Sequence, residues 1–540
     1  MIANTTYQLK WAWMHTSGHR GRLFGYFMLE LVALLLSLLF VYWSKQAVDI
    51  AMHDTAANLK QVLFLVAASL TLGLLMRALS AWLMERTRLQ MGLELQREII
   101  DLQMLSPWKL AKHWHSGDLQ VRINSDCKEV TDMLAFSAMS FVLTVMQLLA
   151  AFGFLWMFDS LLALMIVAVT PLFLFSKLYY KTMRRLSREV KQQESQLGQV
   201  LQENLRFRLL IRAMDLLPKR QRKLEQRHQE IFRLKSAQLN FATLTQTAMK
   251  LTIHAGYLLT FSWGLYRLHA GAISFGTMTA FLQLVGRIQS PIMTMSSFVP
   301  MYIRFRTALE RLVELAKERP EVLAIPQHIT GIEALYVEQL QFRYEDDVLI
   351  EGLDMVLRRA EPLAIVGNSG RGKTTLMRIM LGMLEPQGGR LWFDAQGVAH
   401  PLTAATRINF AYVPQGNTLF SGSISENLMI AAADAGEAQI RHALWIACAE
   451  FVYELPQGLD TLVGEGGHGL SEGQAQRIAI ARAMMRPASV WLFDEVTAAL
   501  DQETSKLLRS RLLAGSSDKL CVFVTHDLSL AAACSQTIYL

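Results

Sequence analysis

The 540-residue sequence has few charged residues and few cysteines for its length. Only 18% of its residues are Asp, Glu, Lys or Arg, whereas a soluble globular chain is usually close to a quarter charged. The four cysteines, Cys127, Cys448, Cys521 and Cys534, show no CxxC or zinc-type spacing, which favours reduced thiols buried in cytosol-facing parts. The low charge and the 52% of hydrophobic residues indicate that part of the chain lies in lipid.

Six apolar stretches are long enough to cross a bilayer as helices, which takes about 20 residues. The first begins near Leu23 and is too long for the core of a cleavable signal peptide, so we expect it to remain as an anchor. A short turn around Asp159 separates the third and fourth stretches and predicts a tight hairpin. The predicted spans are 23–44, 61–83, 134–157, 160–180, 241–266 and 274–303, of which the last two carry more polar residues.

Positive charge gathers in the apolar part of the chain. Residues 1–320 carry 37 Lys and Arg against 21 Asp and Glu, and residues 321–540 carry 16 against 25. Such a basic region could bind nucleic acid, but its positive residues flank apolar segments, which is the membrane pattern, so no nucleic-acid partner is predicted. The basic loops 84–133 and 181–240 read as helical extensions. The positive-inside rule places both loops and both termini in the cytoplasm of a multi-pass protein of the cell membrane, or of the inner membrane in a two-membrane bacterium.

The pattern of apolar and polar residues changes after Pro320 and Pro326. Short apolar runs with Gly-rich turns then alternate with helical patterns, which predicts an α/β domain with a mostly parallel sheet. We therefore expect a helical membrane domain over 1–320, a linker over 321–328 and an α/β ATPase domain over 329–540.

A phosphate-binding loop is the strongest motif in the second half. The segment GNSGRGKTT follows the apolar run 363–366 and precedes a helical pattern, which is the strand–loop–helix context that this motif needs. Backbone N–H groups of the loop and the following helix N-terminus would hold the phosphates of ATP. Lys373 would reach the β- and γ-phosphates, and the Thr374 hydroxyl would help to hold Mg²⁺. The loop residues are Gly367, Asn368, Ser369, Gly370, Arg371, Gly372, Lys373, Thr374 and Thr375.

Two acidic residues follow a second apolar run at 490–493. An acid at the end of a buried strand beside a phosphate site can hold Mg²⁺, which is the role predicted for Asp494. The next acid, Glu495, can polarise the attacking water as a general base. Paired acids at a strand end are weak support alone and strong support beside a phosphate loop.

The stretch LSEGQAQRIAIARAMMRPASVWLFDEVTAALD at 470–501 resembles the signature of ABC transporter ATPases. The resemblance covers the whole ATPase half and implies further ATP-site residues: Tyr344 as the aromatic that stacks on adenine, Gln415 as the glutamine that senses Mg²⁺, Ser471, Gly473 and Gln474 of the signature, and His526 as the switch histidine. Ser471 and Gly473 at a helix start would also make a second phosphate-binding N-terminus. Ala498 stands where the family usually has Ser.

The first half resembles the six-helix membrane domain of ABC exporters, through the segments 115–134 and 276–292. The resemblance implies coupling helices in the cytoplasmic loops, the second near 203–212. It also implies two ATPase domains placed head to tail, with each ATP held between Lys373 of one subunit and Ser471 of the other. This chain has one membrane half and one ATPase half, so we expect a dimer. A homodimer is favoured over a heterodimer because all the ATPase motifs are intact.

Polar residues inside the predicted spans mark a possible substrate pathway. Gln283 and Arg287 share one helix face, as do Lys250 and His254, and we hypothesise that they line a cavity for an anionic or amphipathic substrate. In the alternative, Lys250 lies at the cytoplasmic boundary and Arg287 pairs with a nearby carbonyl. The architecture is compatible with lipid-linked molecules, peptides and hydrophobic drugs.

The sequence therefore predicts an ATP-hydrolysing half-transporter that exports or flips a substrate across the membrane. The alternative is an ATP-gated channel or regulator on the same scaffold, against which the intact Glu495 and His526 argue. Little sequence precedes the first span, so no N-terminal peptidase domain is expected. The chain stops shortly after His526, where relatives usually continue with another strand and a helix, so we also expect a shortened sheet edge.

Overall fold

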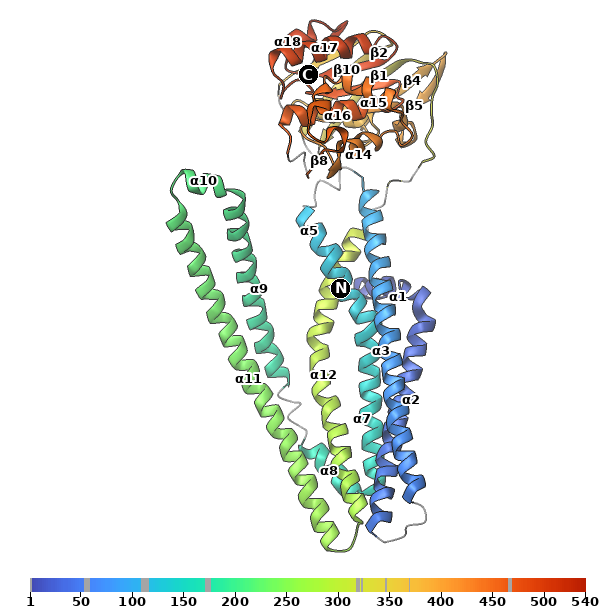
Figure 1. The fold of residues 1–540 in the computed structure, drawn as a ribbon, viewed down its shortest axis with the longest axis vertical. Coiled ribbons are helices and arrows are strands. Elements are labelled where there is room, and N and C mark those ends of the chain that lie inside the picture. The colour runs from blue at the N-terminus through green and yellow to red at the C-terminus, as the bar shows by residue number, and fades with distance from the viewer. Residues whose placement is uncertain are drawn as a thin grey trace. The chain divides into compact units, whose positions relative to one another are not determined.

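The computed structural model describes residues 2–52, 59–107, 116–169, 176–316, 321, 324–344, 347–368, 370–464 and 469–540. It divides into two compact units, a helical one and a mixed α/β one (Figure 1). The helical unit comprises Met1–Asp101 and Ser116–Lys317, and the α/β unit comprises Leu102–His115 and Glu318–Leu540.

Three sheets form the frame of the α/β unit. A parallel sheet in the order β11-β3-β10-β9-β6 lies at its centre, an antiparallel sheet has the order β2-β1-β4-β5, and β7 pairs with β8. The strands are β1 (Ile332–Tyr344), β2 (Asp347–Arg358), β3 (Leu363–Val366), β4 (Gly388–Ala395), β5 (Val398–Pro401), β6 (Phe410–Val413), β7 (Gly422–Ser423), β8 (Leu462–Val463), β9 (Val490–Asp494), β10 (Leu520–Val524) and β11 (Gln536–Tyr539). The parallel sheet expected from the short apolar runs is confirmed.

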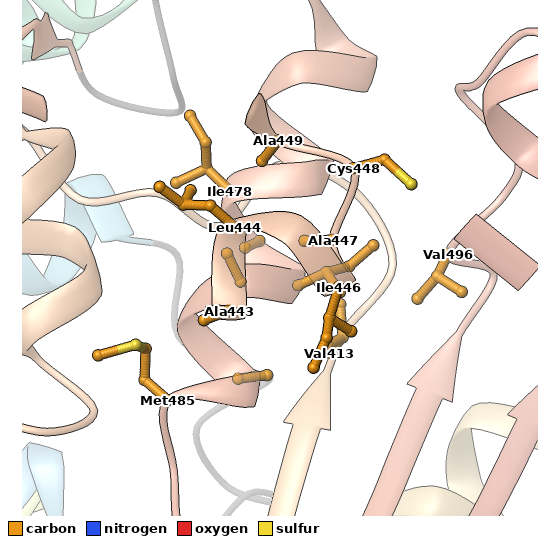
Figure 2. Close-up of a cluster of buried hydrophobic side chains, with 14 of the residues drawn as sticks. Val413, Ala443, Leu444, Ile446, Ala447, Cys448, Ala449, Ile478, Met485 and Val496 are labelled. Atoms are coloured by element: carbon orange, nitrogen blue, oxygen red, sulfur yellow. The ribbon is translucent and has the colours of Figure 1, made fainter. Parts of the chain in front are cut away.

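Helices pack on these sheets and close the core. They are α13 (Lys373–Met380), α14 (Ile424–Met429), α15 (Glu437–Ile446), α16 (Glu472–Met484), α17 (Gln502–Gly515) and α18 (Leu528–Ala531). Strands β3, β9 and β10 are buried along their whole length, because both faces of a parallel sheet are covered. Figure 2 shows part of the larger apolar cluster, in which Val413 of β6, Leu444 of α15 and Ile478 of α16 come together.

The sheet edge next to the phosphate loop is not shortened as the sequence suggested. Residues Gln536–Tyr539 form β11, which pairs in parallel with β3 along Leu363–Val366. The Leu540 N–H then donates to the Val366 carbonyl oxygen at 2.9 Å. The strand was overlooked because three of its four residues are half-buried, Tyr539 is exposed, and the segment shows no apolar run.

Long helices make up the other unit. They are α1 (Ile2–Met14), α2 (Arg20–Met52), α3 (Leu59–Met104), α5 (Ser116–Val121), α6 (Cys127–Thr131), α7 (Ala138–Phe158), α8 (Ser160–Val169), α9 (Ser176–Arg206), α10 (Arg208–Ala213), α11 (Leu217–His269) and α12 (Phe275–Ala316), with a 3-10 turn at Ser17–His19 and π-helical turns at Arg122–Asp126 and Asp132–Ser137.

Within the described residues, three helical stretches are long and apolar enough to cross a membrane: Ser17–Met52, Leu59–Met104 and Asp118–Phe158. The fourth predicted span, 160–180, coincides with α8 and the start of α9, and its residues 170–175 lie outside the described part. The fifth and sixth spans fall inside α11 and α12, whose polar residues lower their apolarity. Those three spans remain predictions.

The turn between α7 and α8 confirms the hairpin predicted around Asp159. One carboxylate oxygen of Asp159 accepts from the Leu162 N–H at 2.9 Å and so caps the start of α8. The other oxygen accepts from the Trp263 indole N–H of α11 at 3.1 Å and lies 3.5 Å from the Arg267 guanidinium. The carboxylate thereby joins the hairpin to α11.

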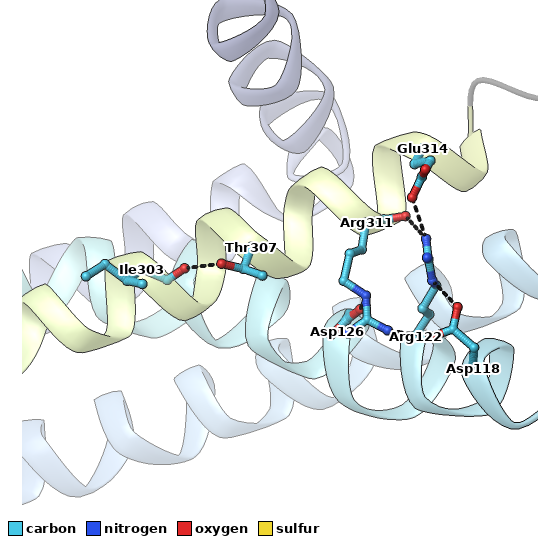
Figure 3. A network of polar contacts seen from close by, with 7 residues as sticks. All are labelled: Asp118, Arg122, Asp126, Ile303, Thr307, Arg311 and Glu314. Atoms are coloured by element: carbon cyan, nitrogen blue, oxygen red, sulfur yellow. Dashed lines mark hydrogen bonds and ion pairs between the residues drawn. The ribbon is translucent and has the colours of Figure 1, made fainter. Parts of the chain in front are cut away.

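A network of ion pairs connects the C-terminal end of α12 to residues 118–126, which precede α7 in the chain (Figure 3). Arg122 is 7% exposed and lies 2.8 Å from Asp118 and 2.9 Å from Glu314 of α12. Arg311 of α12 lies 2.9 Å from Asp118 and 3.2 Å from Asp126. Because each buried charge has an opposite charge beside it, the cost of its burial is offset.

Helices α9 and α11 run side by side and are joined by α10 (Figure 1). Several polar contacts join them: Gln238 donates to Ser187 at 3.0 Å, Lys235 lies 2.7 Å from Glu194, and Arg220 lies 2.8 Å from Glu203. The loop 181–240 is thus a helical extension, as its sequence pattern predicted. Such a polar seam is suited to water rather than to lipid.

Candidate nucleotide site

The Gly-rich segment connects β3 to α13. Gly370 and Gly372 have φ values of 86° and 94°, which only glycine adopts without strain, and Gly372 is followed by the first residue of α13. That first residue, Lys373, is 6% exposed, and its ammonium donates to the carbonyl oxygens of Gly367 at 2.6 Å and of Asn368 at 3.1 Å. Ser369 lies outside the described residues. A phosphate entering this loop would replace the carbonyls as the partner of the ammonium.

Thr374 and Asp494 lie together, as a shared Mg²⁺ site requires. The Thr374 hydroxyl donates to one carboxylate oxygen of Asp494 at 3.1 Å, and Asp494 is 2% exposed at the end of β9. Both are the hard oxygen ligands that Mg²⁺ prefers. In the described part of the chain no group of three or more His, Cys, Asp or Glu residues could hold a metal alone. The pair therefore fits Mg²⁺ that takes its other ligands from nucleotide phosphates and water.

Burial raises the pKa of Asp494, and the Glu495 carboxylate adds to the increase, although the Thr374 hydroxyl opposes it. The neighbouring Tyr412 of β6 also has its pKa raised, to about 12, by burial and by the charge of Asp494. Tyr412 was not selected from the sequence, since nothing in the run 410–413 distinguishes it from a core residue. Asp494 thus bears an uncompensated cost of burial that a divalent cation would relieve.

Replacing Asp494 by asparagine should stabilise the metal-free protein while removing its activity with Mg²⁺ and ATP. A raised pKa in the folded state means that folding disfavours the charged carboxylate, so wild-type stability should rise as the pH falls through that pKa. The variant should unfold a few degrees higher near neutral pH, with a flatter pH dependence. Thermal unfolding in EDTA from pH 5 to 8 measures both, and a lower Tm for the variant would contradict this account.

Glu495, Gln415 and His526 meet at the same edge of the sheet. Their strands, β9, β6 and β10, are parallel neighbours, so the residues that follow their carboxyl ends lie close together. Gln415 donates to one oxygen of Glu495 at 2.6 Å, and the His526 Nε2 lies 3.0 Å from the other oxygen. The same His526 nitrogen lies 3.3 Å from the Lys373 ammonium. The structure therefore brings together the four residues to which catalytic roles were assigned.

The signature segment forms a separate helix N-terminus. Ser471 caps α16: its hydroxyl accepts from the Gln474 N–H at 3.2 Å, and the Gln474 side chain accepts from the Ser471 N–H at 3.0 Å. Gly473 is close-packed, because an added Cβ would lie 2.7 Å from the Ala499 carbonyl oxygen. In the described residues no hydrogen bond joins Ser471 to the phosphate loop. The chain therefore has two separate helix N-termini, those of α13 and α16, at the positions that the sequence suggested, and phosphate binding at each stays a prediction.

Tyr344 ends β1 and lies edge-on to Phe342, with ring centroids 4.9 Å apart. The residues after it, 345 and 346, and residues 465–468 near the signature lie outside the described part. A role for Tyr344 in stacking on adenine remains a prediction.

The membrane-side candidates occupy two helices. Gln283 of α12 donates to the Ser44 hydroxyl of α2 at 3.3 Å, and Arg287 lies half-buried one turn further along α12. Lys250 and His254 are both exposed on α11 within this chain. Their role as a substrate pathway remains a prediction.

Comparison with known proteins agrees with both halves of the chain. Residues 23–292 match the family model of the ABC transporter transmembrane region, and residues 350–498 match that of the ABC transporter ATPase. The chain belongs to the ABC transporter family. A membrane region and an ATPase fused in this way make it a membrane-embedded ATPase whose hydrolysis is coupled to transport.

Among its relatives, the ATP-dependent lipid A-core flippase of Bordetella pertussis is 26% identical over 79% of this chain and 70% of its own length. The leukotoxin translocation ATP-binding protein LktB of Mannheimia haemolytica is 25% identical over 82% of this chain, which spans only 63% of that protein. A solved structure of a bacterial Atm1-family ABC exporter with ATP bound superposes with a TM-score of 0.79 over 96% of this chain and 93% of its own, at 22% identity. That likeness shows the shared fold.

Proposed function

We propose that two copies of this chain form an exporter in which ATP binding and hydrolysis move an anionic or amphipathic substrate across the membrane. The observation that carries the proposal is the presence of two helix N-termini suited to phosphate, at Lys373 and Ser471, that no hydrogen bond joins within the described residues. Two subunits placed head to tail would give each ATP one of each kind. The intact Glu495 and His526 favour this pump over an ATP-gated channel.

The same proposal assigns the parts of the chain. Residues 1–320 form the membrane domain, 321–328 the linker and 329–540 the ATP-binding domain, with the ATPase and both termini in the cytoplasm. ATP would lie against the phosphate loop with its adenine on Tyr344, and Mg²⁺ would be held by Thr374, by Asp494 directly or through water, and by Gln415. Glu495 would act as the general base on the attacking water.

The helix α10 supports a role in coupling the two domains. It lies within the loop where the family resemblance placed the second coupling helix, and it is surrounded by exposed apolar side chains. Such side chains at the tip of a polar hairpin mark an interaction site. We assign this surface to an ATPase domain, by way of Leu205, Phe207, Leu209, Leu210 and Met214.

The proposal is tested by ATPase assays in reconstituted vesicles screened with lipids, peptides and drugs, together with transport of each stimulating compound. We expect stimulation of hydrolysis and ATP-dependent movement by at least one anionic or amphipathic class, both absent in Glu495→Gln. ATP-induced ion current without movement of any stimulating compound would favour the channel instead.

Replacing Arg287 by glutamine should weaken stimulation by anionic compounds more than stimulation by neutral ones. Loss of one charge-assisted contact costs about 1.5–3 kcal/mol, which corresponds to a roughly 10- to 100-fold higher half-maximal concentration for an anion. Arg306→Gln is the matched control, since Arg306 is exposed on the same helix and its ion pair among the described residues is with its neighbour Glu310. Equal shifts for anionic and neutral compounds would refute the assignment of Arg287 to the pathway.

A further inference from the structure

Gln476 is a buried polar residue that none of the roles described so far uses. It lies on α16, five residues after the cap Ser471, and is 3% exposed. Its side-chain amide donates to the backbone carbonyl oxygen of Glu495 at 3.0 Å. Its own side-chain oxygen is buried and has no hydrogen-bond partner among the described residues. Buried polar atoms are normally hydrogen-bonded, so an unpaired oxygen here needs an explanation. The hydrogen bond that the amide N–H makes to Glu495 offers one.

The residue that Gln476 contacts has an unusual backbone. Glu495 has a φ of 53°, in the left-handed region that disfavours side chains other than glycine. Its N–H donates to the Val524 carbonyl oxygen of β10 at 2.9 Å, and its carbonyl oxygen accepts from the Gln476 side chain at 3.0 Å and from the Ala498 N–H at 3.2 Å. A conformation of this kind is strained and persists only where neighbouring contacts maintain it. Of the three contacts to the Glu495 backbone, Gln476 supplies the one that comes from a side chain.

The first turn of α16 is also pressed against the loop that follows Glu495. An added Cβ on Gly473 would lie 2.7 Å from the Ala499 carbonyl oxygen and 3.1 Å from the Leu500 side chain. With Gln476 on the next turn, α16 thus contacts the segment 495–500 at both of its ends. A small movement of the α16 N-terminus therefore has to displace the peptide of Glu495 as well.

We propose that Gln476 is a positioning residue: it couples the binding of ATP at the α16 N-terminus to the position of the catalytic carboxylate of Glu495. The inference rests on the proposed dimer. There Ser471 binds the ATP held by the partner, whereas Glu495 acts on the ATP held by its own Lys373. The Gln476 amide then links one ATP site to the other, so that ATP seated against α16 aligns the general base of the opposite site. Hydrolysis should consequently be cooperative in ATP.

The test compares Gln476→Met with wild type and with Gln439→Met in the full-length protein in detergent or vesicles. Methionine keeps the length of the side chain but removes the donor. Gln439 is the matched control, because it makes the same kind of bond, from its amide to the Met485 carbonyl oxygen at the other end of α16. For Gln476→Met we expect kcat to fall about tenfold, KM for ATP to change by less than about twofold and the Hill coefficient to approach 1.

Unchanged kcat and Hill coefficient in Gln476→Met would overturn the proposal. A fall in kcat that is accompanied by a lower Tm and weaker ATP binding would overturn it too, because general loss of packing produces all three effects. Inactive wild-type protein would instead count against the proposed function, so the two failures are distinguishable.

Gln476→Glu keeps the inference testable if the methionine variant does not fold. A buried carboxyl has its pKa raised, and only its protonated form can donate to the Glu495 carbonyl. The kcat of this variant, divided by that of wild type at each pH, should rise as the pH falls from 8 to 6. A ratio that does not change with pH would contradict the role of the donated hydrogen bond.

Discussion

Glu495→Gln should lower kcat for ATP hydrolysis by roughly 10²–10⁴-fold, the range expected for loss of a general base. The substitution keeps the shape of the side chain and its contact with Gln415 but removes the basic oxygen. ATP binding should survive, because the phosphate loop is unaltered. The ATP-bound dimer should then accumulate, since hydrolysis is the step that releases it.

Two measurements check this outcome. Phosphate release gives kcat, and size-exclusion chromatography of the variant with Mg²⁺ and ATP shows whether a tightly associated dimer forms. Glu503→Gln is the matched control, as Glu503 is exposed in the first turn of α17. A variant that keeps wild-type turnover would exclude Glu495 as the base.

Lys373→Met should weaken ATP binding and hydrolysis together. The ammonium now bonded to the Gly367 and Asn368 carbonyls would transfer to the phosphates, and charge-assisted bonds are worth about 1.5–3 kcal/mol each. One such bond corresponds to a Kd for ATP that is roughly 10- to 100-fold higher. Methionine retains the apolar stem, so the fold should be preserved.

The binding measurement is fluorescence titration with an ATP analogue, alongside thermal unfolding. Lys506→Met is the control, because Lys506 is exposed on α17. Should Lys373→Met bind ATP as tightly as the control, this loop would not be the nucleotide site.

The strand–loop–helix around Lys373 could be predicted from sequence because the residues that determine it are adjacent in the chain. A glycine pattern after an apolar run predicts the strand, the loop and the helix that begins at Lys373 at once. The meeting of Glu495 with His526 follows from a general property of parallel sheets, in which neighbouring strands end at one edge. The order of the strands was not needed for that inference.

Gln476 could not be found in the same way. Its role depends on which face of α16 meets the end of β9, and that contact joins two segments whose packing no periodicity specifies. In the sequence it is one polar residue on a mostly apolar helix. The positive φ of Glu495 was equally invisible, because a strained conformation is maintained by its surroundings rather than by the residue itself.

The membrane half was less predictable in its later part. Helix α11 runs unbroken from Leu217 to His269, so the helical extension predicted within 181–240 continues directly into the span predicted at 241–266. The change from polar to apolar residues occurs within one helix, so hydropathy marks where lipid begins and not where the helix begins. The strand β11 was missed because a segment of four half-buried or exposed residues shows no pattern that identifies a strand.

The polar seam between α9 and α11 limits where the bilayer can lie. Ion pairs such as Lys235 with Glu194 cannot sit in hydrocarbon without penalty, so lipid contact on α11 begins beyond them. From Phe241 to Tyr266 a helix measures roughly 38 Å, against about 30 Å for a typical hydrocarbon core. If α11 carries the predicted fifth span, it would cross obliquely or thicken the lipid around it, which would make the transporter sensitive to acyl-chain length.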